Sequence, residues 1–197
     1  MAGIYDRGGS EPVATIDDGE VMRMVRDGDV GQLGILFERH HGRLYNYCLR
    51  LTGNSEASRD LVQEVFFRML KYRATYRGEG TFLPWFYRLA RNACFDHLRG
   101  SGREVPADVE AMEEAAPGPA PSEEAERREE VRLLSRALHR LPVDKRELLV
   151  MARFGALGYR EIAETLGTTV GAVRVRVHRA LKELRQVYLA IEREATS

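Results

Sequence analysis

The sequence is poor in cysteine, with only Cys48 and Cys94 among its 197 residues. Neither lies in a CxxC pair or in a cysteine–histidine cluster with the spacing of a zinc site. The adjacent His40 and His41 would point to different faces of a helix, so they do not form a metal pair either. The sequence therefore predicts no metal site, and Cys48, which lies in an apolar helical pattern, is predicted to be a small buried side chain.

Long apolar runs are also absent, since no stretch approaches the ~20 residues that span a membrane. The N-terminus, MAGIYDRGGS, lacks the basic start and apolar run of a signal peptide. No nucleophile–base pair, metal cluster or phosphate-binding loop is visible in the sequence. We therefore expect a soluble cytoplasmic protein that is not inserted into a membrane, is not an enzyme and needs no cofactor.

The chain has no excess charge of either sign, because 30 basic residues balance 30 acidic ones. This balance hides a strong segregation. Residues 1–30 have a net charge of −4, residues 31–99 of +5, residues 100–130 of −7 and residues 131–197 of +6. Two basic blocks separated by an acidic block indicate two modules that face nucleic acid and a distinct connector between them.

Strand patterns and internal repeats are missing too, and apolar residues recur at helical spacing. The pattern predicts helices at about 18–27, 32–52, 55–72 (capped by Ser55), 84–99, 126–141, 143–154, 159–166 and from 169 onward, with a loop at 75–81. Residues 1–17 are predicted to be a disordered tail. Residues 100–127 lose the periodicity and are rich in glycine, proline, alanine and acids. The predicted fold is all-α, with helical domains at 18–99 and 128–192 joined by a flexible acidic linker at 100–127.

Residues 158–185, GYREIAETLGTTVGAVRVRVHRALKELR, have the pattern of a helix-turn-helix unit. Gly167 is suited to end the first helix, and Thr168 and Thr169 can cap the second. The second helix has one apolar face, made by Val173, Val177, Ala180, Leu181 and Leu184. A short turn before a basic second helix is typical of units that enter the major groove of DNA.

The other side of that second helix contains the candidates for contact with duplex DNA, which are Thr169, Arg174, Val175, Arg176, Arg179 and Lys182. Basic side chains there neutralise phosphates or contact guanine edges. Val175 is apolar, and two interpretations of it remain open. It contacts a thymine methyl group and so confers specificity, or it is a single exposed valine without a role.

Residues 60–70, DLVQEVFFRML, form a helix with two apolar stripes. One stripe, made by Leu61, Val62, Val65 and Met69, suits a core. The other is made by Gln63, Phe67 and Leu70 and is rimmed by Asp60 and Glu64. Such a helix is either buried on all sides or docked on a partner helix.

Residues 85–99, WFYRLARNACFDHLR, are two-sided in the same way. Phe86, Leu89, Ala90 and Ala93 share one face, while Arg88, Arg91, Asn92, Phe95 and Arg99 form the opposite one. Together with the preceding Tyr76, Phe82 and Trp85, this second face suits unpaired bases, because aromatic rings stack on bases and arginines contact phosphates. The alternative, that Phe82 and Trp85 belong to the core, remains open.

In this order, the three segments resemble RNA polymerase sigma factors of the extracytoplasmic-function (ECF) group of the sigma-70 family, over about residues 18–99 and 128–189. DLVQEVFFRML resembles the helix that binds core polymerase in that family. FLPWFYRLARNACFDHLR is similar to the segment that recognises and melts the −10 element. Residues 141–184, LPVDKRELLVMARFGALGYREIAETLGTTVGAVRVRVHRALKEL, resemble the domain that reads the −35 element. The resemblance implies a sigma-2 helical bundle, a sigma-4 helix-turn-helix domain and a subunit that directs core polymerase to promoters.

The resemblance also implies roles for individual residues. Asp60, Gln63, Glu64, Phe67 and Leu70 would contact the clamp helices of the polymerase β′ subunit. The 75–81 loop would capture a flipped −10 base, and Arg88, Asn92 and Arg99 would hold the opened strand. Partners implied are core RNA polymerase through its β′ and β subunits, promoter DNA that is duplex at −35 and unwound at −10, and an anti-sigma factor.

Two questions stay open at this level. The acidic linker would thread toward the polymerase active centre, where its charge either mimics nucleic acid or only keeps the spacer in solution. The main alternative function is a stand-alone helix-turn-helix repressor or activator, which binds a two-fold duplex site as a dimer without polymerase. That alternative leaves the second stripe of residues 60–70 and the aromatic-basic face of residues 85–99 unexplained.

Overall fold

The computed structural model describes residues 16–78, 82–101, 124–155 and 157–196. Every regular element among these residues is helical, which confirms the predicted all-α class. Most of the predicted N-terminal tail, the end of the 75–81 loop and most of the predicted linker lie outside the described residues. The helices are α1 (Asp18–Arg26), α2 (Leu33–Thr52), α3 (Ser55–Lys71), α4 (Phe82–Ser101), α6 (Glu124–His139), α7 (Val143–Phe154), α8 (Tyr159–Leu166) and α9 (Val170–Thr196), with 3-10 turns at Val30–Gln32 and Arg73–Thr75.

The helix ends follow from local chemistry. Gly53 ends α2 at a φ of 74°, a left-handed conformation that glycine adopts without steric cost. The cap of α3 is one residue earlier than predicted. The side chain of Asn54, and not that of Ser55, accepts a hydrogen bond from the backbone N–H of Ala57 at 2.8 Å. Ser55 is the first helical residue, because Asn54 has the extended backbone that a capping position requires.

Helices α1 to α4, the first helical group, surround an aromatic-rich core. The largest fully buried side chains in it are those of Tyr47, Tyr87 and Phe86. Tyr47 and Tyr87 meet edge to face, with ring centroids 5.3 Å apart. Cys48 is completely buried as predicted, and its sulfur lies 3.6 Å from that of Cys94 in α4. The core therefore ties α2 to α4 and determines which side of α4 remains outside.

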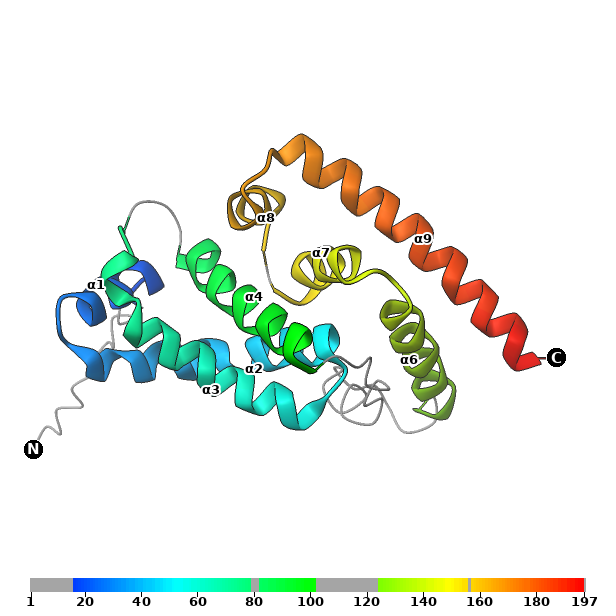
Figure 1. The fold of residues 1–197 in the computed structure, drawn as a ribbon, viewed down its shortest axis with the longest axis horizontal. Helices are drawn as coiled ribbons and strands as arrows, with labels where there is room; N and C mark the ends of the chain where they lie inside the picture. The colour runs from blue at the N-terminus through cyan, green and yellow to red at the C-terminus, as the bar shows by residue number, and fades with distance from the viewer. Residues whose placement is uncertain (1–15, 79–81, 102–123, 156, 197) are drawn as a thin grey trace, which may run out of the picture.

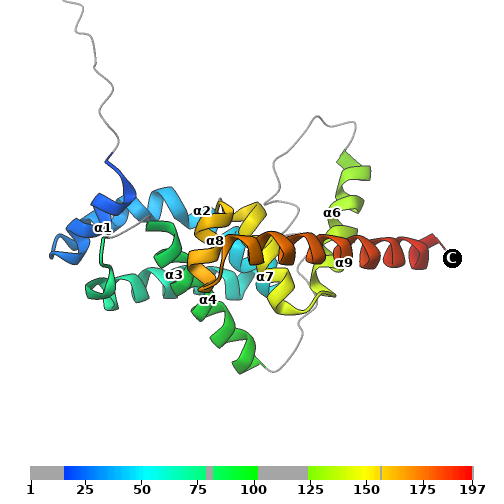
Figure 2. The same cartoon turned by 90° about the horizontal axis from the view of Figure 1, so that it is seen from above.

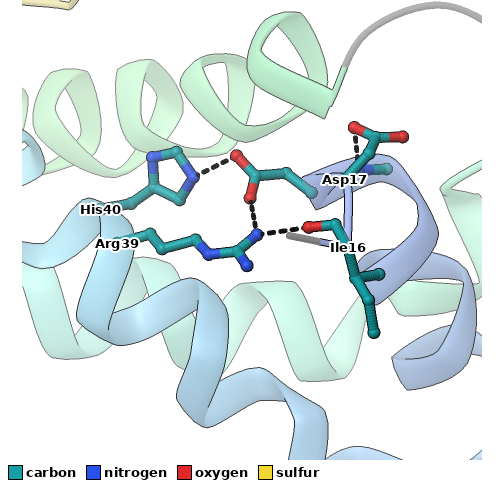
Figure 3. A network of polar contacts seen from close by, with 6 residues as sticks. Ile16, Asp17, Arg39 and His40 are labelled. Carbon is teal, nitrogen blue, oxygen red and sulfur yellow. Dashed lines mark hydrogen bonds and ion pairs between the residues drawn. The ribbon is translucent and has the colours of Figure 1, made fainter. Parts of the chain in front are cut away.

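A polar network joins α1 to α2 (Figure 3). Arg39 donates hydrogen bonds to the Asp18 carboxylate at 2.7 Å and to the Ile16 carbonyl at 2.8 Å, and the His40 ring nitrogen lies 2.7 Å from the other Asp18 oxygen. Burial raises the pKa of Asp18, but the hydrogen bonds from Arg39 and His40 outweigh it, so the pKa lies below its usual value. His40 is thus a buried structural side chain.

Helices α6 to α9, the second helical group, contain the predicted helix-turn-helix unit. Gly167 ends α8 at a φ of 63°, and the Thr169 hydroxyl accepts a hydrogen bond from the Ala172 N–H at 3.2 Å. Both features confirm the prediction. One apolar assignment was wrong, because Leu181 is 51% exposed. The C-terminal half of α9 packs on α6 through a small cluster of Leu133, Ala137 and Ile191, against which Leu184, Val187 and Tyr188 of α9 also pack.

The two helical groups pack against each other (Figures 1 and 2). Helix α7 lies against α2, and α8 lies against α4. One continuous cluster of buried apolar side chains extends from the first group into the second. From the sequence we expected two modules joined by a flexible linker, and we did not predict this contact between them. Among the described residues, no helix combines the length and apolar character needed to cross a membrane.

Candidate nucleic-acid interface

The outer face of α3 exposes the second stripe that the sequence predicted. Phe67 is 61% exposed, although a phenylalanine is usually buried. Gln63 and Asp60 are exposed beside it, while Leu70 is partly buried. Glu64 accepts a hydrogen bond from Arg68 at 2.6 Å, and Arg68 also reaches Asp96 on α4. The core stripe of the same helix, Leu61, Val62, Val65 and Met69, is buried as predicted.

The outer face of α4 presents arginines, an amide and an aromatic ring. Arg88, Asn92 and Arg99 are exposed. Trp85 is half-buried, and its indole N–H donates to the Thr75 hydroxyl at 3.2 Å, which holds the ring at the rim of the loop. A surface hollow is lined by Tyr72, Thr75, Tyr76, Arg77, Trp85, Arg88, Leu89, Asn92 and Glu164. This face combines stacking surface with positive charge, as binding of a single strand requires.

A neighbouring hollow continues along α4. Its lining includes Arg68, Arg91, Asn92, Phe95, Asp96 and Arg99. The guanidinium of Arg91 lies over the Phe95 ring, 4.7 Å from its centroid. The Arg91 cation therefore packs on the Phe95 ring, so these two predicted residues lie in direct contact.

The structure departs from the sequence prediction at Tyr76 and Phe82. Tyr76 was predicted to face unpaired DNA, but it is only 3% exposed. Its ring packs edge to face on Trp85, with centroids 5.3 Å apart, and also on Phe82, which is equally buried. In this conformation Tyr76 packs against Trp85 from the core side and presents little surface to a base. The alternative that Phe82 belongs to the core is correct, and Trp85 lies between core and surface.

The outer face of α9 presents all the predicted duplex-contacting residues. Thr169, Arg174, Val175, Arg176, Arg179 and Lys182 are exposed. Val173, Val177 and Ala180 on the opposite face are buried and hold the helix on α7 and α8. Val175 is 50% exposed and is surrounded in sequence by arginines. The helix thus offers a basic surface with one apolar position.

Glu147 of α7 is the charged residue near the interface that sequence reasoning missed. Its side chain is 3% exposed, and its Oε1 atom lies 2.8 Å from Nε of Arg91 on α4. Burial raises the pKa of Glu147, and the nearby Arg91 offsets part of that rise. A signal was available in the sequence. Glu147 falls in helical register with Val143, Val150 and Met151, which places a carboxylate on the apolar face of α7.

A second contact connects the faces that the sequence assigned to different modules. Arg88 of α4 donates a hydrogen bond to the Glu164 carbonyl of α8 at 3.3 Å. Two of the predicted −10 residues, Arg88 and Arg91, therefore touch the second helical group.

Among the described residues, no group of histidine, cysteine or acidic side chains could hold a metal ion.

Comparisons with known proteins identify the family. The family model of Sigma-70 region 2 matches residues 36–104, and that of Sigma-70, region 4 matches residues 132–184. RNA polymerase sigma factor CarQ of Myxococcus xanthus is 31% identical over 173 residues, which cover 88% of this chain and 98% of CarQ. ECF RNA polymerase sigma factor SigE of Mycolicibacterium smegmatis is 35% identical over 162 residues, covering 79% of this chain and 60% of SigE.

A solved structure shares the fold. The sigma factor RpoE of Bartonella quintana, crystallised with the anti-sigma factor NepR, superposes with a TM-score of 0.59 at 21% identity. The match covers 81% of this chain and 96% of the RpoE chain.

Proposed function

Because this chain belongs to the ECF group of the sigma-70 family and so directs RNA polymerase to promoters, we propose that its two helical groups divide promoter recognition between them. Residues 18–99 form the sigma-2 domain, which binds core polymerase and the unwound −10 element. Residues 128–192 form the sigma-4 domain, which reads the −35 element as duplex. Residues 100–127 are the acidic linker. The protein acts with polymerase in the cytoplasm and contributes no catalytic chemistry of its own.

The observation that carries this proposal is the outer face of α4. Arg88, Asn92 and Arg99 are exposed there beside the half-buried Trp85, on the side opposite the core. A flat ring next to guanidinium groups binds a strand whose bases are unstacked, because rings stack on bases while arginines neutralise phosphates. Unstacking costs a few kcal/mol per base step, which capture of the −10 strand offsets. Promotion of DNA melting follows from that capture.

Core polymerase binds on the outer face of α3. The support is an exposed phenylalanine, Phe67, flanked by Gln63 and by the acidic Asp60 and Glu64. An amphipathic stripe of this kind suits a helix-on-helix contact, here with the clamp helices of the β′ subunit. The same exposed surfaces could be covered by an anti-sigma factor, and the RpoE–NepR complex supports that partner by analogy.

A reconstitution experiment tests the proposal. Transcripts made from genomic DNA by core polymerase with this protein are sequenced to identify a promoter, and permanganate reactivity of its −10 thymines reports melting. We expect Asn92→Ala with Arg88→Ala to lower open-complex formation at least about tenfold, since a lost hydrogen bond to a charged group such as a phosphate costs about 1.5–3 kcal/mol. Polymerase binding should not change.

Two controls sharpen the result. Arg43→Ala removes an exposed arginine from α2, outside the proposed faces, and should transcribe like the wild type. Duplex binding by the protein alone, without any effect of added core polymerase, would contradict the proposal and favour a stand-alone repressor.

A further inference from the structure

Glu147 lies between the two helical groups and touches both α2 and α4. Its Oε1 atom is 2.8 Å from Nε of Arg91 and accepts a hydrogen bond from the Tyr47 hydroxyl at 3.4 Å. Tyr47 is completely buried, and the Glu147 side chain is 3% exposed. A buried carboxylate is costly unless it is paired. Arg91 is the cation that pairs with this carboxylate, so it contributes to the packing of α7 onto the first helical group.

Two other contacts in the same interface join α7 to α2. Arg146 of α7 donates a hydrogen bond to the Leu51 carbonyl of α2 at 2.8 Å. The guanidinium of Arg50 lies 3.8 Å from the centroid of the Phe154 ring. These contacts engage residues outside the proposed DNA surfaces, so they stabilise the packed arrangement without competing with DNA. Arg91 is different, because it also belongs to the proposed −10 face.

A phosphate would compete with Glu147 for Arg91. Carboxylates and phosphates are the same class of ligand for a guanidinium, which binds either through charge-assisted hydrogen bonds. The Glu147 carboxylate already lies at the Arg91 Nε atom. A strand phosphate that draws the guanidinium outward would pull Nε away from the carboxylate and leave the carboxylate buried without its cation. Strand binding at Arg91 and packing of α7 thus oppose each other.

The packed arrangement is also too short for a promoter. The −10 and −35 elements lie about 25 base pairs apart, which is about 85 Å of B-form DNA at ~3.4 Å per pair. Arg88 of α4 and Glu164 of α8 are in direct contact, at 3.3 Å. Helix α8 leads directly into α9, so the proposed −10 face of α4 and the proposed −35 face of α9 cannot reach the two elements at once while this contact persists. Promoter binding requires the groups to separate.

We propose that Glu147 is an intramolecular latch that occupies Arg91 in place of a DNA phosphate and keeps the free protein closed. The latch rests on the proposed role of α4 in holding the −10 strand. Separation of the groups frees Arg91, and strand binding then holds the protein open. The apparent affinity of the free chain for a strand is reduced by the fraction of molecules that are closed.

The test compares Glu147→Gln with Glu130→Gln in the full chain. Glu130 is exposed on α6, so its variant makes the same change of charge away from the interface. Small-angle X-ray scattering without DNA measures the radius of gyration, and circular dichroism confirms the helical content. We expect Glu147→Gln to increase the radius of gyration and Glu130→Gln to leave it unchanged. An unchanged radius in Glu147→Gln overturns the latch.

A second measurement follows the competition. The probe is an oligothymidine of about 12 nucleotides, which tests phosphate contact without a promoter sequence, because phosphate contacts do not read bases. We expect Glu147→Gln to bind it about tenfold more tightly than the wild type. Equal affinity of Glu147→Gln and Glu130→Gln overturns the competition.

Arg91→Gln separates this inference from the proposed function. It removes the latch partner and the phosphate contact together, so the chain should open and yet bind the probe more weakly than Glu147→Gln. If Arg91→Gln binds the probe as tightly as Glu147→Gln, the proposed role of Arg91 at −10 fails. The radius of gyration of Glu147→Gln still decides the latch in that case.

Discussion

Arg146 donates a hydrogen bond from its guanidinium to the Nδ1 atom of His139, at 2.8 Å. The same guanidinium donates to the His139 carbonyl at 2.9 Å and to the Leu141 carbonyl at 3.3 Å. Arg146 thereby holds the turn between α6 and α7 and, through Leu51, joins that turn to α2. This geometry requires a neutral imidazole, because a protonated Nδ1 has no lone pair to accept the bond.

Acid should destabilise the protein through His139. Burial and the Arg146 charge lower the pKa of His139 from 6.5 to about 4 in the folded state. Between these values the unfolded chain binds the proton and the folded chain does not, so stability is complete above pH 6.5 and is lost as pH falls toward 4. The loss at pH 4 is about 3 kcal/mol. Urea unfolding of the wild type across this range measures it.

His139→Gln is the control for that prediction. Glutamine can accept the Arg146 hydrogen bond but does not titrate, so this part of the acid sensitivity should disappear. The carboxylate network at Asp18 has a lowered pKa, and its contribution is lost at more acid pH in both proteins. An equal loss of stability in both proteins between pH 6.5 and 4 would contradict the assignment.

Two adjacent phenylalanines of α3 should respond to alanine in opposite ways. Phe66 is 6% exposed and packs on Phe37 and Phe86, so Phe66→Ala should cost about 3–5 kcal/mol of folding free energy. Phe67 is 61% exposed, so Phe67→Ala should change stability by less than about 0.5 kcal/mol.

Binding to core polymerase distinguishes the same pair of variants. Phe67→Ala should weaken it at least about tenfold, the effect of losing an aromatic anchor of an interface. Binding is measured by titrating labelled protein with core enzyme at a temperature where both variants are folded. Full affinity of Phe67→Ala would remove the stripe on α3 from the polymerase interface.

Val175 should determine part of the −35 preference. Its side chain is half-exposed on the outer face of α9, where an apolar group fits a thymine methyl. We expect Val175→Ser to lose discrimination at one base pair, by about 1 kcal/mol, and to keep its affinity for nonspecific DNA. Selection of −35 sequences from a randomised pool by the wild-type and variant holoenzymes measures it. An identical selected consensus would leave Val175 as an exposed valine without a role.

The two thiols should be inert in the folded protein. Cys48 and Cys94 are completely buried. The hydrogen bond with Cys48, together with burial, raises the pKa of the Cys94 thiol well above its usual value, so little thiolate forms. A thiol reagent such as dithionitrobenzoate should titrate none of the cysteines in native protein and both in denaturant. Rapid reaction without denaturant would show that the α2–α4 core opens.

Some features of the fold and site were predictable because they depend on neighbours along the chain. Gly167 and Thr169 bound the turn of the helix-turn-helix unit as expected, and α7 spans the residues that its periodicity predicted. The exposed faces of α3 and α9 followed from helical spacing alone. At Leu181 the same reasoning failed, because periodicity gives a direction and not the width of the surface that covers it.

The sequence by itself determined the helices, the family and most residues on each outer face, because these depend on local spacing and on motifs. Only the tertiary structure decided that Tyr76 supports Trp85 from the core and that Glu147 pairs with Arg91 across two helical groups. Residues 91 and 147 lie far apart in the chain, and no local pattern specifies which cation a buried carboxylate will meet. The tertiary packing determines that partner, because a charge that is buried away from water must be paired.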